Sequence, residues 1–223
     1  MEGNSKSNLM AQVIAEPYEV TLNRDPQWAM LEGSRHFEEN SYVFKALRKV
    51  VARLHACGVQ YAVLGDLAMF RHGYRRYTEV VEILVSRQNF DIVCQRLVGG
   101  EYVLDDTMPR AMRDAEYGVR IQFSLAGDLV GRGISIAFPE PADASVSIGG
   151  TSIIRLERLI DLKLASAASK LVRIRDRADV QELVRVLKLP AEIGSKLSPR
   201  FRSEFEELRD AIISVPDPFE QGG

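Results

Sequence analysis

The sequence predicts an α+β protein with a mixed β-sheet, flanking helices and a helical C-terminal section. Three observations support this fold class. An apolar run of strand length, VQYAVLG, passes through a short helical stretch into a second apolar run, TEVVEILVS. The segment GVRIQFSLAG alternates apolar and polar residues, as a strand with two different faces does. After Leu156 the apolar periodicity is helical.

These patterns divide the chain into three segments. Residues 1–40 are polar, and we expect an N-terminal arm with one short strand in YEVTL. Residues 41–155 are expected to form the α/β core, and residues 156–223 the helical C-terminal section. Further short strands are predicted in EYVL, ISIAF, SVSI and TSIIRL, which glycine and proline turns separate.

Residues with capping preferences predict where several helices begin and end. Ser41 and Ser86 each precede an apolar helical pattern, and Gly58 follows the first of these patterns. The last helix is expected to have Ser198 as its cap and Pro199 at its first position.

The composition is that of an ordinary globular protein, with 223 residues of which 46% are hydrophobic and 27% charged. A net charge of −2 gives no support to nucleic-acid binding, but it does not exclude a local basic patch. The N-terminal residues do not resemble a signal peptide, and no apolar run is long enough to span a bilayer. We therefore expect a cytoplasmic protein that does not bind membranes.

The cysteine and histidine content does not predict a metal centre of the zinc type. Cys57 and Cys94 lie in apolar helical patterns, which is typical of buried thiols in a reducing compartment. The three histidines are scattered, and no C-x-x-C pair is present.

The corner after the first predicted strand is suited to an anion. The strand ends at Gly65 and leads into a helix, whose N-terminal amides and dipole favour negative charge. Gly65 is therefore a candidate nucleotide- or phosphate-binding residue. Many α/β proteins have such a corner, and Asp66 can equally serve as the N-cap of the short helix.

The span YAVLGDLAMFRHGYRRYTEVVEILV, residues 61–85, resembles the opening motif of the nucleotidyltransferase superfamily, which has the DNA polymerase β-like fold. The likeness is to bacterial minimal nucleotidyltransferases and to nucleotidyltransferase-type toxins. It continues in GVRIQFSLAGD, in AFPEPAD and in LIDLKLASAASKLVRIRDRADVQELV, and so covers roughly residues 40–190.

This resemblance implies transfer of a nucleotidyl group from a nucleoside triphosphate with the help of two Mg²⁺ ions. One ion activates the attacking hydroxyl, and the other stabilises the leaving pyrophosphate. The family carries an Asp-x-Asp pair on a strand, because positions i and i+2 point to the same face. A third carboxylate comes from a later strand.

This chain departs from the family pattern at its carboxylates. Val80 stands at the first aspartate position, Glu82 at the second, and Gln122 at the third. Glu82 is either a remaining ligand or a solvated strand residue. Mg²⁺ binding by Glu82 and Glu79 is expected to be weak or absent, since a regular strand points these two side chains to opposite faces, and only a bulge brings them together.

At several other positions, this chain has residues that match the family pattern more closely. Asp66 stands at the second glycine of the corner and, with Glu82, is the candidate for any remaining catalysis. Lys163 matches a helical lysine that the resemblance assigns to the triphosphate, and Asp176 and Asp179 match a late acidic motif.

The basic turn before the second strand is also kept. Arg75 and Arg76 match it, and with Lys163 and Asp176 they complete the candidate phosphate-binding set. Each of these residues also has an ordinary interpretation, as part of a surface turn or a solvated helix face.

The sequence supports three functional hypotheses. The first is a catalytically degenerate nucleotidyltransferase-fold protein that keeps a cationic cleft for a nucleotide or another phosphate ligand. The second is an active nucleotidyltransferase with a rearranged Glu/Asp site, which transfers a nucleotide to RNA, protein or a small molecule. The third is an interaction module of a toxin–antitoxin-like system, in which the arm docks a protein partner.

Overall fold

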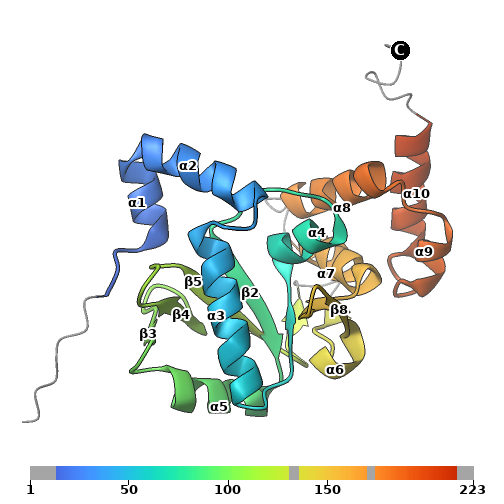
Figure 1. The fold of residues 1–223 in the computed structure, drawn as a ribbon. Helices are drawn as coiled ribbons and strands as arrows, with labels where there is room; N and C mark the ends of the chain where they lie inside the picture. The colour runs from blue at the N-terminus through green and yellow to red at the C-terminus, as the bar shows by residue number, and fades with distance from the viewer. Residues whose placement is uncertain (1–13, 131–135, 170–173, 215–223) are drawn as a thin grey trace, which may run out of the picture.

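The computed structural model describes residues 14–130, 136–169 and 174–214 (Figure 1). The strands are β1 Tyr61–Val63, β2 Val80–Val85, β3 Tyr102–Leu104, β4 Ala111–Asp114, β5 Arg120–Leu125, β6 Leu129–Val130, β7 Ile136–Ala137, β8 Ser145–Ile148 and β9 Thr151–Ile154. Within these residues, a seven-stranded mixed sheet has the order β3-β4-β5-β2-β1-β9-β8, and β6 and β7 form a separate pair. This architecture confirms the predicted α+β class.

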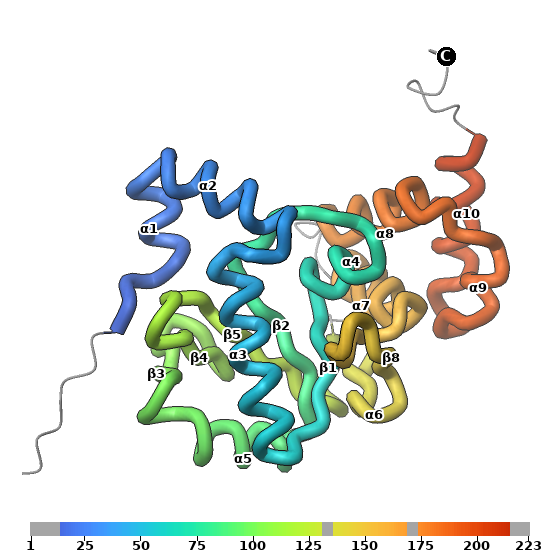
Figure 2. Tube along the Cα trace, in the orientation of Figure 1, coloured from blue at the N-terminus to red at the C-terminus, as the bar shows by residue number. Residues whose placement is uncertain are grey.

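The helices surround the sheet and extend beyond one side of it. They are α1 Tyr18–Arg24, α2 Pro26–Phe37, α3 Tyr42–Ala56, α4 Gly65–His72, α5 Arg87–Leu97, α6 Pro141–Ala144, α7 Leu156–Ser169, α8 Ile174–Leu187, α9 Glu192–Lys196 and α10 Arg202–Ile213. In Figure 1, α3 crosses in front of the sheet, and the tube in Figure 2 shows α8, α9 and α10 gathered at the right. None of the helices among the described residues combines the length and apolar character that a membrane span requires.

The alternation of the central strands gives the sheet one apolar face and one mixed face. Ile121, Phe123 and Leu125 of β5 are buried, as are Val81 and Ile83 of β2. Helix α3 packs against β2 and buries a continuous apolar stripe along its length. Because successive strand residues point to opposite faces, the polar residues of β2 and β5 face away from this core.

The predicted caps are confirmed for two helices and wrong for the last one. The Ser41 hydroxyl accepts a hydrogen bond from the Phe44 amide at the start of α3, and the Ser86 hydroxyl accepts one from Asn89 at the start of α5. Helix α10, however, begins at Arg202 instead of Pro199. The Ser198 N–H donates to the buried carboxylate of Asp161 on α7, which holds this segment as a turn ahead of the helix.

The predicted strand YEVTL is wrong, because Tyr18–Arg24 is the helix α1. A helix places Tyr18 and Leu22 on the same face, where Tyr18 is buried and Leu22 packs against the core. The strand β4 was not expected, since its sequence AMRD contains two charged residues. The predicted strand ISIAF is present as β7 at residues 136–137, and residues 134–135 lie outside the described part of the chain.

The arm packs on the core through buried polar contacts. Glu32 of α2 is fully buried, and its Oε2 accepts from the Tyr18 hydroxyl at 3.1 Å and from the Tyr42 amide at 2.8 Å. Glu19 of α1 lies 2.6 Å from the guanidinium of Arg113 on β4. Because a buried charge is strongly destabilising without its partner, these contacts fix where α1 and α2 lie.

His36 of α2 connects the arm to the turn that follows α4. Its Nε2 lies 3.1 Å from the carbonyl oxygen of Arg76, and its Nδ1 lies 3.2 Å from the Ser41 hydroxyl. A carbonyl oxygen only accepts, so Nε2 carries the proton and Nδ1 accepts from the hydroxyl. Burial lowers the pKa of His36, although the hydrogen bond to Arg76 and the charges of Glu32 and Asp66 oppose this effect.

We expect the NMR titration midpoint of the His36 ring to lie below 6.5 in the folded protein and to return to about 6.5 in concentrated urea. The unfolded chain then binds the proton more readily than the fold does. The stabilisation that neutral His36 contributes is therefore present above pH 6.5 and is lost as the pH falls from there through the folded pKa.

His36→Gln removes this titration, so its free energy of unfolding should fall less than that of the wild type between neutral and mildly acidic pH. A folded-state midpoint at or above the urea value contradicts the expected neutral, buried ring.

Candidate functional site

The three positions at which the resemblance expects metal-binding carboxylates lie together on the mixed face of the sheet. Strands β2 and β5 run parallel, and their register places Val80 beside Arg120 and Glu82 beside Gln122. Residues directly opposite each other in a ladder share a face. The fold therefore assembles the three positions, and Glu82 is the one carboxylate that they contain.

Glu82 lies against the first turn of α4, where Gly65 leaves room for it. Gly65 has a φ of +61°, and a Cβ on this residue would lie 1.5 Å from Oε2 of Glu82. The Asp66 amide donates a hydrogen bond to the Glu82 carboxylate. The first amides of a helix lack partners within the helix and favour a negative group. Glu82 thus caps α4 from a neighbouring strand.

The expected capping role of Asp66 is wrong. Leu64 is the N-cap residue of α4 and provides no side-chain cap, while Asp66 lies within the first turn. The carboxylate of Asp66 instead faces two cations, with Oδ2 3.5 Å from Nε of Arg76 and Oδ1 3.7 Å from Nζ of Lys163. Because the Glu82 carboxylate interacts with the amide at the start of α4, the Asp66 side chain is not needed as a cap and can form these ion pairs.

Lys163 of α7 lies at the centre of three aspartates. Its Nζ lies 2.6 Å from Oδ2 of Asp179, 3.2 Å from Oδ1 of Asp176 and 3.7 Å from Oδ1 of Asp66. Asp176 and Asp179 come from α8, and Asp66 comes from α4, so one ammonium joins three helices. We call Asp66, Asp176 and Asp179 the carboxylate cage. The Lys163 side chain is 12% exposed and that of Asp179 is 6% exposed.

The remaining oxygens of the cage also have donors. Oδ1 of Asp179 accepts from the guanidinium of Arg76, which is the same guanidinium that faces Asp66. The Ser166 hydroxyl, one turn after Lys163 on α7, donates to Oδ2 of Asp176 at 2.7 Å. Every carboxylate oxygen of the cage therefore faces an N–H or O–H group of the chain itself.

Burial and charge shift the pKa values of this group in different directions. Burial raises the pKa of Glu82 and of Asp66, although Lys163 opposes both shifts. For Lys163, burial alone would lower the pKa, but the charges of the cage, that of Asp179 first, outweigh burial and raise it. The ammonium is thus held in its charged form.

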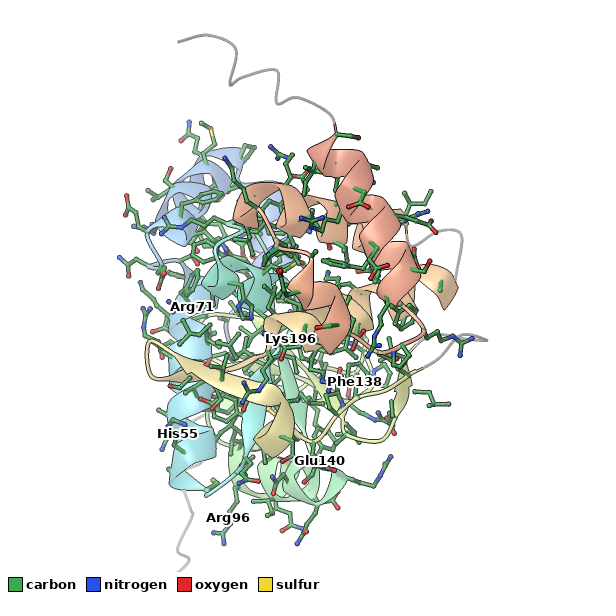
Figure 3. All side chains as sticks on the ribbon, turned by 90° about the vertical axis from the view of Figure 1, so that its right-hand side faces the viewer. His55, Arg71, Arg96, Phe138, Glu140 and Lys196 are labelled. Atoms are coloured by element: carbon green, nitrogen blue, oxygen red, sulfur yellow. The ribbon has the colours of Figure 1, made fainter. Side chains whose placement is uncertain are left out.

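A pocket of 190 Å³ lies between the sheet, the start of α4 and α7. This volume is below the roughly 300–1,000 Å³ that is typical of small-molecule sites. Figure 3, turned so that α9 and α10 face the viewer, labels Phe138 from the wall of this pocket. The lining residues are apolar Leu64, Gly65, Val130, Phe138, Leu159 and Leu162, and polar Glu82, Ser124, Lys163, Ser166 and Asp176.

The charges of the described residues in this group do not favour the expected cationic cleft, which stays a prediction. Lys163 and Arg76 are the cations of this group, and the cage together with Glu82 contributes more acidic groups than they can neutralise. An incoming phosphate would meet Glu82 and Asp176 in the pocket wall. The acidic neighbours that hold the two cations thus reduce their attraction for an anion.

Two of the proposed site residues lie outside this arrangement. Glu79 is exposed in the segment just before β2 and does not line the pocket. Arg75 is also exposed, and its guanidinium lies 5.5 Å from the ring centroid of Phe70, in a cation–π contact. The structure therefore brings together Gly65, Glu82 and the cage with Arg76 and Lys163, without Glu79 and Arg75.

The residues at this site do not fit the metal ions that the resemblance implies. Mg²⁺ requires oxygen ligands in near-octahedral geometry. Across residues 14–130, 136–169 and 174–214, no group of three or more His, Cys, Asp or Glu side chains is arranged to hold a metal ion. The oxygens of the cage face donors of the chain, and Glu82 caps α4.

Sequence reasoning missed His36, Ser166 and Phe138. Ser166 follows Lys163 by three residues, and this helical spacing could have placed its hydroxyl on the same face. His36 and Phe138 reach the site or its border only through the tertiary fold, and the sequence carries no spacing that indicates this.

We expect Gly65→Ala to lower the free energy of unfolding by about 1–3 kcal/mol, because alanine is strained at positive φ and its Cβ displaces Glu82. Urea unfolding followed by circular dichroism measures this loss. Gly33→Ala in α2 is the matched control, since Gly33 has no neighbour within 4 Å of an added Cβ. The control should be neutral or stabilising, because alanine is the better helix former. Equal losses in both variants would refute the close approach of Glu82 to Gly65.

No protein-family model matches this chain, and no curated protein matches it. Similar solved structures include ANT(2'')-Ia, described as an antibiotic-resistance factor, at 12% identity and a TM-score of 0.48, covering 76% of this chain and 96% of that chain. A proposed nucleotidyltransferase from Thermotoga maritima is similar at 14% identity and a TM-score of 0.41, covering 63% of this chain and 91% of that chain.

A third similar structure is a proposed nucleotidyltransferase from H. pylori, at 16% identity and a TM-score of 0.42, covering 80% of this chain and 84% of that chain. None of these likenesses carries a substrate or an activity over to this chain. The function of this chain has to be inferred from its own side chains.

Proposed function

We propose that this chain is a nucleotidyltransferase-fold protein that has lost metal-dependent nucleotidyl transfer and acts by binding. The observation that carries this proposal is the register of β2 and β5. Val80 and Gln122 lie beside Glu82 on one face, and neither side chain is a carboxylate. A two-metal mechanism needs carboxylate oxygens at these positions to hold the ions against the phosphates.

The other acidic groups of the site support the same conclusion. The Glu82 carboxylate accepts the Asp66 amide, and the cage holds Lys163 and Arg76. A rearranged metal site would have to break these contacts and leave buried cations without partners, which is costly. The alternative of an active enzyme with Glu82, Glu79 and Asp66 also requires Glu79, which is exposed, to reach the pocket.

The same contacts limit what the site binds. A phosphate group has to compete with the cage for Lys163 and Arg76, and the pocket of 190 Å³ is small. The binding that we propose is therefore that of a small ligand, or of one part of a larger ligand, and it does not depend on Mg²⁺.

An assay for nucleotidyl transfer tests this proposal. The purified protein is incubated with each labelled nucleoside triphosphate, with Mg²⁺ or Mn²⁺, and with RNA, protein or small-molecule acceptors. We expect no transfer above the level of Glu82→Gln, and any nucleotide binding measured by equilibrium dialysis should be equal with and without Mg²⁺. The Gln side chain still accepts the Asp66 amide, so this variant keeps the helix cap.

If the wild type transfers a nucleotide and Glu82→Gln does not, the proposal is overturned in favour of the active alternative. Nucleotide binding that appears only with Mg²⁺ would also count against it, because it would require metal ligands that the site does not offer.

A second candidate function, docking of a protein partner by the arm, is favoured by exposed apolar side chains on α2. Met30 is 77% exposed, and Leu31 and Phe37 are each 46% exposed. Met30 and Phe37 are two helical turns apart and so lie on the same side of α2, and apolar side chains exposed together are typical of an interaction surface. The toxin–antitoxin-like hypothesis places the partner here.

We expect a partner from the native source to be retained by the wild type and lost with Met30→Glu in a pull-down experiment. Val186→Glu is the control, because Val186 of α8 is also exposed, at 41%, and lies away from α2 in the sequence. Retention of the same proteins by all three forms would argue against the arm as a docking segment.

A further inference from the structure

The carboxylate cage has the composition of a cation site, and the cation is part of the chain. Its three carboxylates converge on Nζ of Lys163 at 2.6, 3.2 and 3.7 Å. Three carboxylates at such distances from one point would repel one another if no positive charge lay between them. Lys163, together with Arg76, reduces this repulsion.

We propose that the Lys163 ammonium is the resident cation of this site, where it occupies the cage in place of a metal ion and excludes divalent ions from it. This inference deepens the proposed function, on which it rests, because it adds a second reason, beside Val80 and Gln122, for the proposed lack of Mg²⁺ binding. It assigns Lys163 to the cage instead of to a phosphate ligand.

The hydrogen bonds of the cage support this assignment. Oδ2 of Asp179, Oδ1 of Asp176 and Oδ1 of Asp66 face Lys163, and the outer oxygens face Arg76 or Ser166. A divalent ion would need several of these oxygens at once, in a near-octahedral arrangement. It could obtain them only by displacing Lys163 and leaving a buried ammonium unpaired, which is strongly destabilising.

The attachment of the ammonium to α7 strengthens this exclusion. A group that is part of the same chain has an effective concentration in the millimolar range or above, and an external ion has to compete with it. Mg²⁺ also loses its water reluctantly, so it gains little from a cage that already contains a cation. Exclusion should therefore hold at the Mg²⁺ concentrations of ordinary assays.

A titration with Mn²⁺ on the nucleotide-free protein tests the proposal, with bound ion followed by electron paramagnetic resonance. We expect the wild type to show no saturable site. Lys163→Ala opens the cage, and we expect it to bind one Mn²⁺ per chain. Mn²⁺ should then raise the melting temperature of Lys163→Ala and leave that of the wild type unchanged, since a ligand that binds only the folded state stabilises it.

Propylammonium provides a second probe, because it replaces the part of the lysine side chain that alanine lacks. It should raise the melting temperature of Lys163→Ala and not that of the wild type. If Lys163→Ala does not fold alone, recovery of the folded state with Mn²⁺ or propylammonium supports the proposal equally. The wild-type titration is independent of how the variant folds.

Arg113→Ala is the matched control for removal of a cation from an acidic cluster. Arg113 pairs with Glu19 and Asp105, and Arg120 lies within 3 Å of both carboxylates. The cluster therefore keeps a cation when Arg113 is removed, and we expect neither Mn²⁺ binding nor a response to propylammonium.

Saturable Mn²⁺ binding by the wild type that Asp179→Asn abolishes would overturn the proposal, because it would place a metal in the cage beside Lys163. The proposal also fails if neither Mn²⁺ nor propylammonium binds to folded Lys163→Ala or restores folding where the variant is unfolded. These outcomes differ from the one that would overturn the proposed function. If the protein performs nucleotidyl transfer but the nucleotide-free protein binds no Mn²⁺, the proposed function fails and the proposal about Lys163 does not.

Discussion

The arrangement of the site depends on the buried ion pair between Lys163 and Asp179, whose atoms lie 2.6 Å apart. This pair joins α7 to α8, and the second oxygen of Asp179 holds Arg76 in the turn after α4. The carbonyl of Arg76 in turn accepts from His36 of the arm. A continuous series of contacts thus connects α2 to α8. Removal of one member of the Lys163–Asp179 pair would leave the other charge buried without a partner, which strongly destabilises the fold.

The contact between Glu82 and Gly65 gives the carboxylate at position 82 a structural role that needs no metal ion. Glu82 caps α4 through the Asp66 amide, and this role depends only on its position beside a glycine. Val80 and Gln122 lie on the same face and have no comparable structural role in the contacts described. A carboxylate at position 82 therefore has a structural use that does not require metal binding.

The parts of the fold that sequence predicted well are those with a strong local period. The apolar stripe of α3 and the alternation of β5 each identify their element without knowledge of its neighbours. The failures lie where distant partners decide the structure. Strand β4 is fully buried despite Arg113 and Asp114, because Glu19 and Lys49, far away in the sequence, neutralise them.

The same limit explains why the sequence indicated candidate residues for the site but not the ion pairs among them. The strand–helix–strand order accounts for the proximity of Gly65 and Glu82, whereas Lys163 was placed near them only by the family resemblance. Whether a lysine attracts phosphate depends instead on its partners. Those of Lys163 come from two other helices, and their carboxylates screen its charge at distances below 4 Å. The chemistry of a side chain at a motif position therefore depends on its ion pairs as well as on its residue type.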